Sequence, residues 1–209
     1  MEAQKNEKFY ISLGDNGDNA LAVIDMQKDF AYPEGALFVG GVHGEPTSDE
    51  VVKRVNALIA DYPFDWVALS RDRHPDNHIE FSIFGKHCLM MTDGADFATE
   101  LVRPKGDWEV VDKGHDKDVF SYSVVTSGVF PGHIRNLRAK GIKRVFVCGL
   151  AYTHCVGESA IAYACQGFET YVIRDATRSV PPPYGNPESM DRKLELYGVK
   201  LITVADIIK

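Results

Sequence analysis

Short apolar runs alternate with amphipathic stretches along most of this chain. The first run leads through ALAVI from Ala20 to Asp25, and its continuous apolar character is typical of a strand buried on both faces. Comparable runs predict further strands at residues 64–70, 108–112, 143–149, 169–174 and 199–204.

Between these runs, apolar residues recur at helical spacing. The clearest stretch covers residues 49–61, where Thr47 and Glu50 have the spacing of a capping box and Pro63 ends the pattern. Its apolar stripe consists of Val51, Val52, Val55, Leu58 and Ile59. Further helices are predicted at residues 131–140, starting at Pro131, and at residues 154–166 and 188–197.

Strands that alternate with helices predict an α/β fold with a mainly parallel central sheet and helices on both of its faces, a three-layer α/β/α arrangement. The sequence shows no internal repeat and no domain linker. We therefore expect a single domain over residues 1–209, in which residues 1–19 form a polar N-terminal lead-in.

Composition narrows the class of protein. The net charge is −7, and no block of Lys and Arg stands out, so we expect neither a nucleic acid nor a membrane as partner. The lead-in lacks the apolar core of a signal peptide, and no apolar run is long enough to span a bilayer. The four cysteines form no CxxC pair, which suits a reducing compartment and predicts a cytoplasmic location.

Chemically capable residues follow the predicted strands at the points where those strands end. Asp25 closes the first strand, Asp72 and His74 follow the second, Lys113 follows the third, and Cys155 comes shortly after the fourth. Because ligands of open parallel sheets bind outside the carboxyl ends of the strands, these side chains are expected to meet at one edge.

Cys155 has the setting of a nucleophile. It lies at the start of a predicted helix, where free N–H groups and the helix dipole favour a thiolate and can hold an oxyanion. The alternative is a buried structural cysteine, the more common role of a lone cysteine. Asp25 would accept the thiol proton and Lys113 would stabilise charge, although a strand-end carboxylate can instead cap a turn and most lysines are surface residues.

The segment SRDRHPDNH, residues 70–78, is rich in metal ligands. Asp72 and His74 point to the same side of an extended chain, and His87 would complete a set of two histidines and one carboxylate. That ligand mix suits Zn²⁺, with Fe²⁺ or Mn²⁺ as alternatives. A D-x-H pair also occurs in ordinary polar loops, and His78 is expected to lie outside the ligand set or to face solvent.

These segments, in this order, resemble the nicotinamidases of the isochorismatase-like cysteine hydrolases. The matching stretches are AVIDMQKDF (22–30), SRDRHPDNHIEFS (70–82), KHC (86–88), GADF (94–97), KG (113–114), YS (122–123) and GLAYTHCV (149–156). The resemblance implies the isochorismatase-like hydrolase fold, a catalytic triad of Asp25, Lys113 and Cys155, and metal ligands Asp72, His74 and His87. It also implies a cis peptide between Leu150 and Ala151, with the N–H groups of Ala151 and Cys155 as the oxyanion hole.

The resemblance extends to the substrate pocket. It places Phe30 against the substrate ring and Tyr122 in the same pocket. The family often has a tryptophan and a proline before the His-Cys pair, whereas here Phe84 stands near that position and is expected to supply the aromatic wall. The stretch VPPPYGNPESM also looks longer than the usual connection.

The activity implied is hydrolysis of nicotinamide to nicotinate and ammonia through a cysteine thioester, a reaction of NAD salvage. The alternatives are another amidase of the superfamily acting on a carbamoyl or ureido compound, an isochorismatase, and a non-catalytic ligand-binding protein of the same fold. By analogy with the family we expect a homo-oligomer with a small-molecule substrate.

Overall fold

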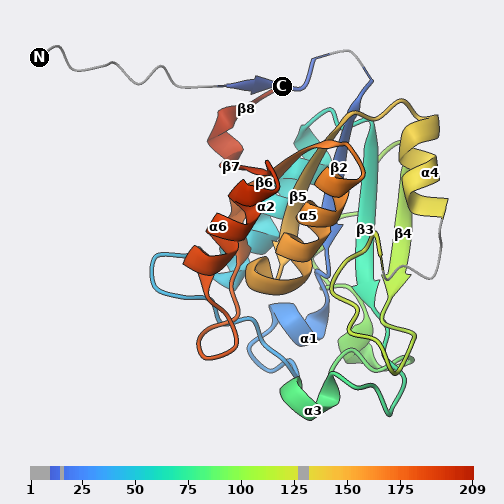
Figure 1. Cartoon of the computed structure of the whole chain (residues 1–209), viewed down its shortest axis with the longest axis vertical. Coiled ribbons are helices and arrows are strands. Elements are labelled where there is room, and N and C mark those ends of the chain that lie inside the picture. Colours follow the sequence, from blue (N-terminus) through green and yellow to red (C-terminus); the bar gives the residue numbers. More distant parts are fainter. Residues whose placement is uncertain (1–9, 15–16, 127–131) are drawn as a thin grey trace, which may run out of the picture.

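The computed structural model describes residues 10–14, 17–126 and 132–209, and its centre is a six-stranded parallel sheet (Figure 1). The spatial order is β4-β3-β2-β5-β6-β7, and every neighbouring pair is parallel. The strands are β2 (Asn19–Ile24), β3 (Trp66–Asp72), β4 (Trp108–Lys113), β5 (Arg144–Leu150), β6 (Glu169–Arg178) and β7 (Lys200–Ile202).

Helices cover both faces of this sheet, because successive side chains of the central strand point in opposite directions. Leu21 and Val23 of β2 pack in one core cluster with α2 (Ser48–Asp61). Ala20, Ala22 and Ile24 pack in the other cluster, which includes residues of α4 (Gly132–Ala139), α5 (Gly157–Cys165) and α6 (Pro187–Leu196). The predicted three-layer α/β/α arrangement with a mainly parallel sheet is confirmed.

The capping box that the sequence predicts for α2 is present, and α6 has a cap that was not predicted. Thr47 accepts a hydrogen bond from the Glu50 N–H, and the Glu50 carboxylate accepts one from the Thr47 N–H, which completes the capping box of α2. At α6, the Asn186 side chain caps the first turn and Pro187 occupies its start. Pro131, the predicted start of α4, lies outside the described residues.

Two parts of the chain differ from the predictions. The first residues of the helix predicted at 154–166 belong to a wider π-helical turn, Tyr152–Val156, and the α-helix α5 begins only at Gly157. Within the polar lead-in, β1 (Ile11–Ser12) pairs with β8 (Ile207–Ile208), and Ile11 and Leu13 are buried. Two-residue strands carry too little alternation to be recognised from sequence.

Short elements collect beyond the carboxyl ends of the strands, at the lower end of the molecule in Figure 1. They are α1 (Lys28–Ala31), α3 (Phe81–Phe84) and the single turn η1 (Asp93–Ala95); a further turn, η3 (Val204–Asp206), precedes β8. Among the described residues, no helix is long and apolar enough to cross a membrane.

Candidate active site

Three charged or nucleophilic side chains meet at the carboxyl ends of the central strands. Lys113, the last residue of β4, places its Nζ 2.8 Å from Asp25 Oδ2, 2.5 Å from Asp72 Oδ1 and 3.5 Å from Cys155 Sγ. The Lys113 and Asp25 side chains are fully buried. The structure therefore brings Asp25, Lys113 and Cys155 together as one cluster, although β3, β4, β5 and long loops lie between Asp25 and Cys155 in sequence.

Backbone conformation fixes the nucleophile close to Asp25. Gly149 in β5 has φ +106°, and a Cβ built there would lie 2.1 Å from the Ile24 carbonyl oxygen, so only glycine lets the two strands approach this closely. Asp25 itself has φ 47°, a left-handed conformation that non-glycine residues rarely adopt and that recurs at functional sites. Leu150 and Ala151 are joined by a cis peptide, as the resemblance implies.

Two polar side chains that the sequence analysis did not single out hold this arrangement. The Ser70 hydroxyl donates to Asp25 Oδ1 at 2.6 Å and accepts a hydrogen bond from the Asp25 N–H. The Gln27 amide donates to the Asp72 and Ala95 carbonyls and accepts from the Asp72 N–H. The backbones that carry the two carboxylates are thus tied to one another by buried hydrogen bonds.

Burial dominates the electrostatics of the cluster. Burial raises the pKa of Asp25 despite the Lys113 ammonium beside it, which suits this carboxylate to accept a proton. Burial would lower the pKa of Lys113, but Asp25 and Asp72 outweigh it and hold that pKa well above its usual value. The lysine therefore stays charged.

The sequence-based expectation for the Cys155 thiol was wrong in direction. The start of a helix was expected to favour the thiolate, whereas burial raises the pKa of Cys155 well above its usual value. Lys113 lowers this pKa, but Asp25 and Asp72 oppose it. In the free protein the thiol therefore keeps its proton until a base removes it.

A second cluster, adjacent to the first, has the donor set of a metal site. Ligand atoms of His74, Glu80 and His87 lie within 4.8 Å of one another, and all three residues are buried. The His74 Nδ1 lies 3.1 Å from the Gly114 carbonyl oxygen and the His87 Nδ1 lies 2.8 Å from that of Gly85. These contacts leave the Nε2 atom of each ring for a ligand, and the His74 Nε2 is buried without a hydrogen-bond partner.

The predicted ligand set of Asp72, His74 and His87 is only partly assembled in this cluster. Asp72 Oδ2 lies 3.8 Å from the His74 Nε2, while its Oδ1 is taken by Lys113. Glu80, which the sequence analysis missed, lies 3.9 Å from the same nitrogen. Its position six residues after His74, in the segment that holds the other ligands, was the available indication.

Two imidazole nitrogens and a carboxylate fit a divalent cation such as zinc. Burial raises the pKa of Glu80 to about 7 and lowers the pKa of His74 to about 3. His78 lies outside this set, with its ring centroid 4.0 Å from that of His74 and its Nδ1 accepting from the Glu80 N–H. A cation would favour the carboxylate form of Glu80, since nearby positive charge lowers a carboxyl pKa.

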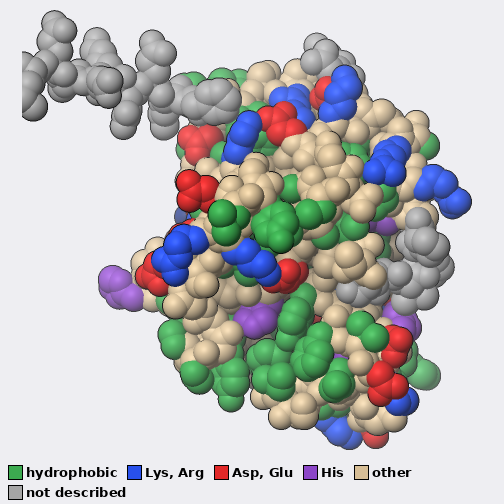
Figure 2. Space-filling model, in the orientation of Figure 1, with side chains coloured by type: hydrophobic (Ala, Val, Ile, Leu, Met, Phe, Trp, Pro, Cys, Tyr) green, Lys and Arg blue, Asp and Glu red, His purple; other side chains and the backbone are tan. Residues whose placement is uncertain are grey.

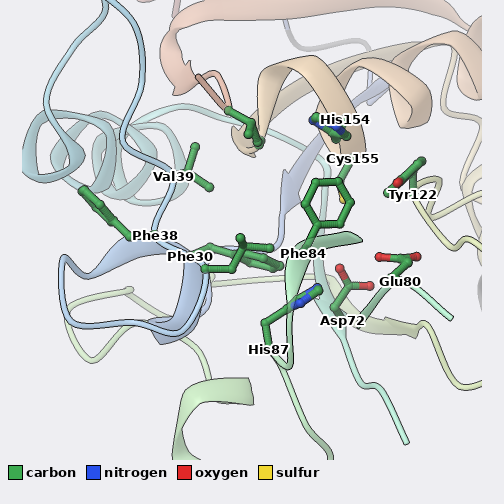
Figure 3. Close-up of a pocket in the computed structure, with 13 residues that line it drawn as sticks. Phe30, Phe38, Val39, Asp72, Glu80, Phe84, His87, Tyr122, His154 and Cys155 are labelled. Carbon is green, nitrogen blue, oxygen red and sulfur yellow. The ribbon is translucent and has the colours of Figure 1, made fainter. Parts of the chain in front are cut away.

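A pocket open to solvent joins the two clusters (Figure 3). Cys155 and Ala151 line one side of it, and Asp72, Glu80 and His87 line another. The predicted pocket residues Phe30, Phe84 and Tyr122 all lie in its wall. The remaining wall residues were not predicted: Leu37, Phe38, Val39, His154 and Val180. The pocket wall is thus mostly apolar or aromatic, with polar groups at the thiol, the ligand cluster, Tyr122 and His154, a composition suited to a flat aromatic ring with one reactive group.

Comparison with known proteins gives a consistent result. The Isochorismatase domain profile matches residues 19–206. The chain is 28% identical to a nicotinamidase of Schizosaccharomyces pombe over 215 aligned residues, 87% of this chain and 93% of the relative.

Solved structures agree with this. PnC1 of L. infantum in complex with nicotinate superposes with a TM-score of 0.84 at 28% identity, covering 96% of this chain and 99% of that one. A pyrazinamidase of Pyrococcus horikoshii in complex with zinc superposes with a TM-score of 0.75 at 31% identity, covering 89% and 99%.

Proposed function

The chain belongs to the isochorismatase family, and we propose that it hydrolyses nicotinamide to nicotinate and ammonia, a reaction of NAD salvage. One observation carries this proposal. A buried Cys155 thiol, in contact with Lys113 and beside Asp25, faces an apolar pocket whose other side holds the His74, Glu80 and His87 cluster. The nicotinamidase of S. pombe and the nicotinate complex of L. infantum PnC1 support the choice of substrate.

The first half of the reaction forms a thioester. Asp25 takes the thiol proton as Cys155 Sγ attacks the carboxamide carbon, because the raised pKa of the thiol requires a base and the raised pKa of Asp25 makes it one. The N–H groups of Ala151 and Cys155 hold the oxyanion, and Lys113 balances the negative charge. The C–N bond then breaks, and ammonia leaves with the proton from Asp25.

The second half of the reaction regenerates the thiol. Asp25 removes a proton from water, the resulting hydroxide attacks the thioester carbon, and nicotinate leaves as the C–S bond breaks. Asp25 then returns the proton to the Cys155 sulfur. The same carboxylate thus serves twice, which is consistent with its fixed hydrogen bond from Ser70.

We assign the ligand cluster to one divalent cation, zinc in the first instance, with Fe²⁺ or Mn²⁺ as alternatives. His74 and His87 would hold it, together with the carboxylates of Asp72 and Glu80. A cation there supplies a Lewis-acidic anchor for the pyridine nitrogen and so orients the ring. The zinc complex of the P. horikoshii pyrazinamidase supports this assignment. Phe30, Phe84 and Tyr122 would pack around the bound ring.

The test is ammonia release from nicotinamide by purified protein loaded with zinc. The wild type and Cys165→Ala, which removes an exposed cysteine, should both release ammonia, and Cys155→Ala should be slower by several orders of magnitude. N-carbamoylsarcosine is the parallel substrate for the ureido alternative. Release from that compound alone would move the assignment to another amide within the family. Near-normal turnover by Cys155→Ala would refute the thioester mechanism.

A further inference from the structure

The ring of Phe84 forms an outer wall of the pocket, and three separate segments of the chain contact it. Its ring centroid lies 6.4 Å from that of His87, 5.6 Å from that of His154 and 5.7 Å from that of Tyr184. In Figure 3, Phe84 stands among the labelled residues between Phe30 and Tyr122. The first two contacts join Phe84 to the ligand cluster and to the nucleophile turn, and the third joins it to the proline-rich loop.

The helix that carries Phe84 is held at its start, where the Phe81 ring contacts those of His74 and His87. α3 is four residues long, none of its residues is buried, and it ends at Gly85 with φ 74°. Ile83, beside Phe84, is exposed. Figure 2 shows apolar side chains gathered on the lower part of the molecule, next to a histidine. Phe81 thus anchors the start of α3, and the ring contacts of Phe84 with His154 and Tyr184 hold its end at the pocket wall.

The proline-rich loop, residues 180–186, is by contrast fixed to the nucleophile turn. The Val180 N–H donates to Thr153 Oγ1 at 3.2 Å, and Val180 lines the pocket. A Cβ on Gly185 would lie 1.9 Å from the Val180 carbonyl oxygen and 2.8 Å from Thr153 Oγ1, so the loop folds tightly against the residue two before Cys155. The backbone that carries Tyr184 is therefore held in a fixed position relative to Cys155.

Tyr184 is 56% exposed, and among the described residues its hydroxyl makes no hydrogen bond. Its one ring contact is with Phe84, within the same described part of the chain. Burial and hydrogen bonding thus give no structural reason for an aromatic side chain here, whereas contact with the pocket wall does.

We propose that Tyr184 is a positioning residue that holds Phe84 over the pocket and thereby limits the substrate to single-ring aromatic carboxamides. The substrate class rests on the proposed nicotinamidase function, but the contact between Tyr184 and Phe84 does not. A fused second ring, as in quinoline-3-carboxamide, keeps the pyridine nitrogen and carboxamide of nicotinamide and adds bulk along the edge of the ring next to the nitrogen. We expect this larger ring system to fit only when the Phe84 side chain moves outward.

The first experiment compares kcat/KM for nicotinamide and for quinoline-3-carboxamide. In Tyr184→Ala the ratio of quinoline-3-carboxamide to nicotinamide should rise about three- to tenfold, the range expected for loss of one aromatic pair. The change should appear in KM for nicotinamide with kcat retained. Tyr184→Phe should restore the wild-type ratio, because the contact uses the ring. Tyr197→Ala removes a tyrosine of similar exposure (48%) at the end of α6 and should leave the ratio unchanged.

The second experiment needs no substrate. Iodoacetamide and N-phenyl iodoacetamide both alkylate cysteine with loss of iodide, and mass spectrometry measures the rate at Cys155 relative to the exposed Cys165. Tyr184→Ala should raise the relative rate of the phenyl reagent at Cys155 by a similar factor. An unchanged reagent ratio in Tyr184→Ala overturns the proposal. A wild type inactive on nicotinamide would refute the proposed function instead, and the alkylation ratio would still decide the role of Tyr184.

Discussion

Two clusters of largely buried polar side chains, both within the described part of the chain, differ in how completely their atoms are partnered. One is the cluster of Asp25, Lys113 and Cys155 with the adjoining histidines, at the carboxyl ends of the strands. The other lies between β4, α4 and α5, where Glu109 contacts His133 and His133 contacts Tyr163. Both contain a carboxylate and an imidazole, so residue types alone do not separate them.

In the second cluster, the hydrogen-bonding atoms find their partners within the cluster. His133 Nδ1 lies 2.6 Å from Glu109 Oε1, and His133 Nε2 lies 2.5 Å from the Tyr163 hydroxyl, so both ring nitrogens are used. Asn136 and Trp66 donate the remaining hydrogen bonds to Glu109. A network with every partner in place stabilises the fold and leaves nothing for a ligand.

The first cluster is incomplete by the same standard. The Nε2 atoms of His74 and His78 are buried without a hydrogen-bond partner, and the Cys155 thiol faces a pocket. Unpartnered buried polar atoms cost free energy, so their presence indicates a site that a ligand completes. Substitutions in the first cluster are therefore expected to reduce activity or metal binding, and substitutions in the second are expected to reduce stability.

The largest expected effect is that of Lys113→Met. The substitution leaves Asp25 and Asp72 without their shared cation, so activity should fall by on the order of 10²–10⁴-fold. Lys140→Met removes an exposed lysine paired with Asp107 and should retain full activity. Steady-state assays on protein shown by thermal unfolding to be folded make the measurement, and a folded, fully active Lys113→Met variant would contradict the assigned role.

His74→Ala should abolish stoichiometric zinc binding, because it removes the nitrogen that points at the other ligands. Elemental analysis after dialysis against a weak chelator measures the metal content directly. His43→Ala, at an exposed histidine, provides the control and should bind zinc as the wild type does. Equal zinc in His74→Ala and wild type would exclude this cluster as the metal site.

Glu80→Gln should have a smaller effect on the same property. The amide keeps the shape of the side chain but removes its charge, so zinc should dissociate about ten- to a hundredfold more readily, while saturating zinc still fills the site. Competition with a fluorescent zinc chelator gives the dissociation constant. If Asp72→Asn alone weakened zinc binding and Glu80→Gln did not, Asp72 would be the carboxylate ligand, as the sequence predicted.

Glu109→Gln should lower the free energy of unfolding by about 1–2 kcal/mol and leave kcat and KM unaltered. Burial alone would raise the pKa of Glu109, but the hydrogen bonds from His133 and Asn136 lower it below its ordinary 4.5. The stabilisation is therefore present above pH 4.5 and lost as the pH falls through the folded-state pKa. Urea unfolding at pH 7 and at pH 3 should show the difference from wild type shrinking at the lower pH. An equal difference at both would contradict the carboxylate's role.

The sequence predicted the part of this site that the sheet positions. Asp25 and Lys113 lie at strand ends, and parallel strands bring such residues to one edge whatever the loops between them do. Glu80, Phe38 and Val180 were missed because long-range contacts place their loops. The direction of the Cys155 pKa was missed for a related reason, since burial depends on the whole packed structure and the helix start is local.

Gly149 cannot be exchanged, whereas residues in the outer wall of the pocket can. A side chain there would meet the Ile24 carbonyl, separate two central strands and move Cys155 away from Asp25. Phe84 stands on the four-residue helix α3, Val39 on a loop and Tyr184 on the proline-rich loop in contact with Phe84, so exchange at these positions changes the outline of the pocket without moving the reacting groups. A library aimed at new amide substrates would therefore randomise the loops and keep position 149 constant, and natural diversification of this enzyme has the same freedom and the same limit.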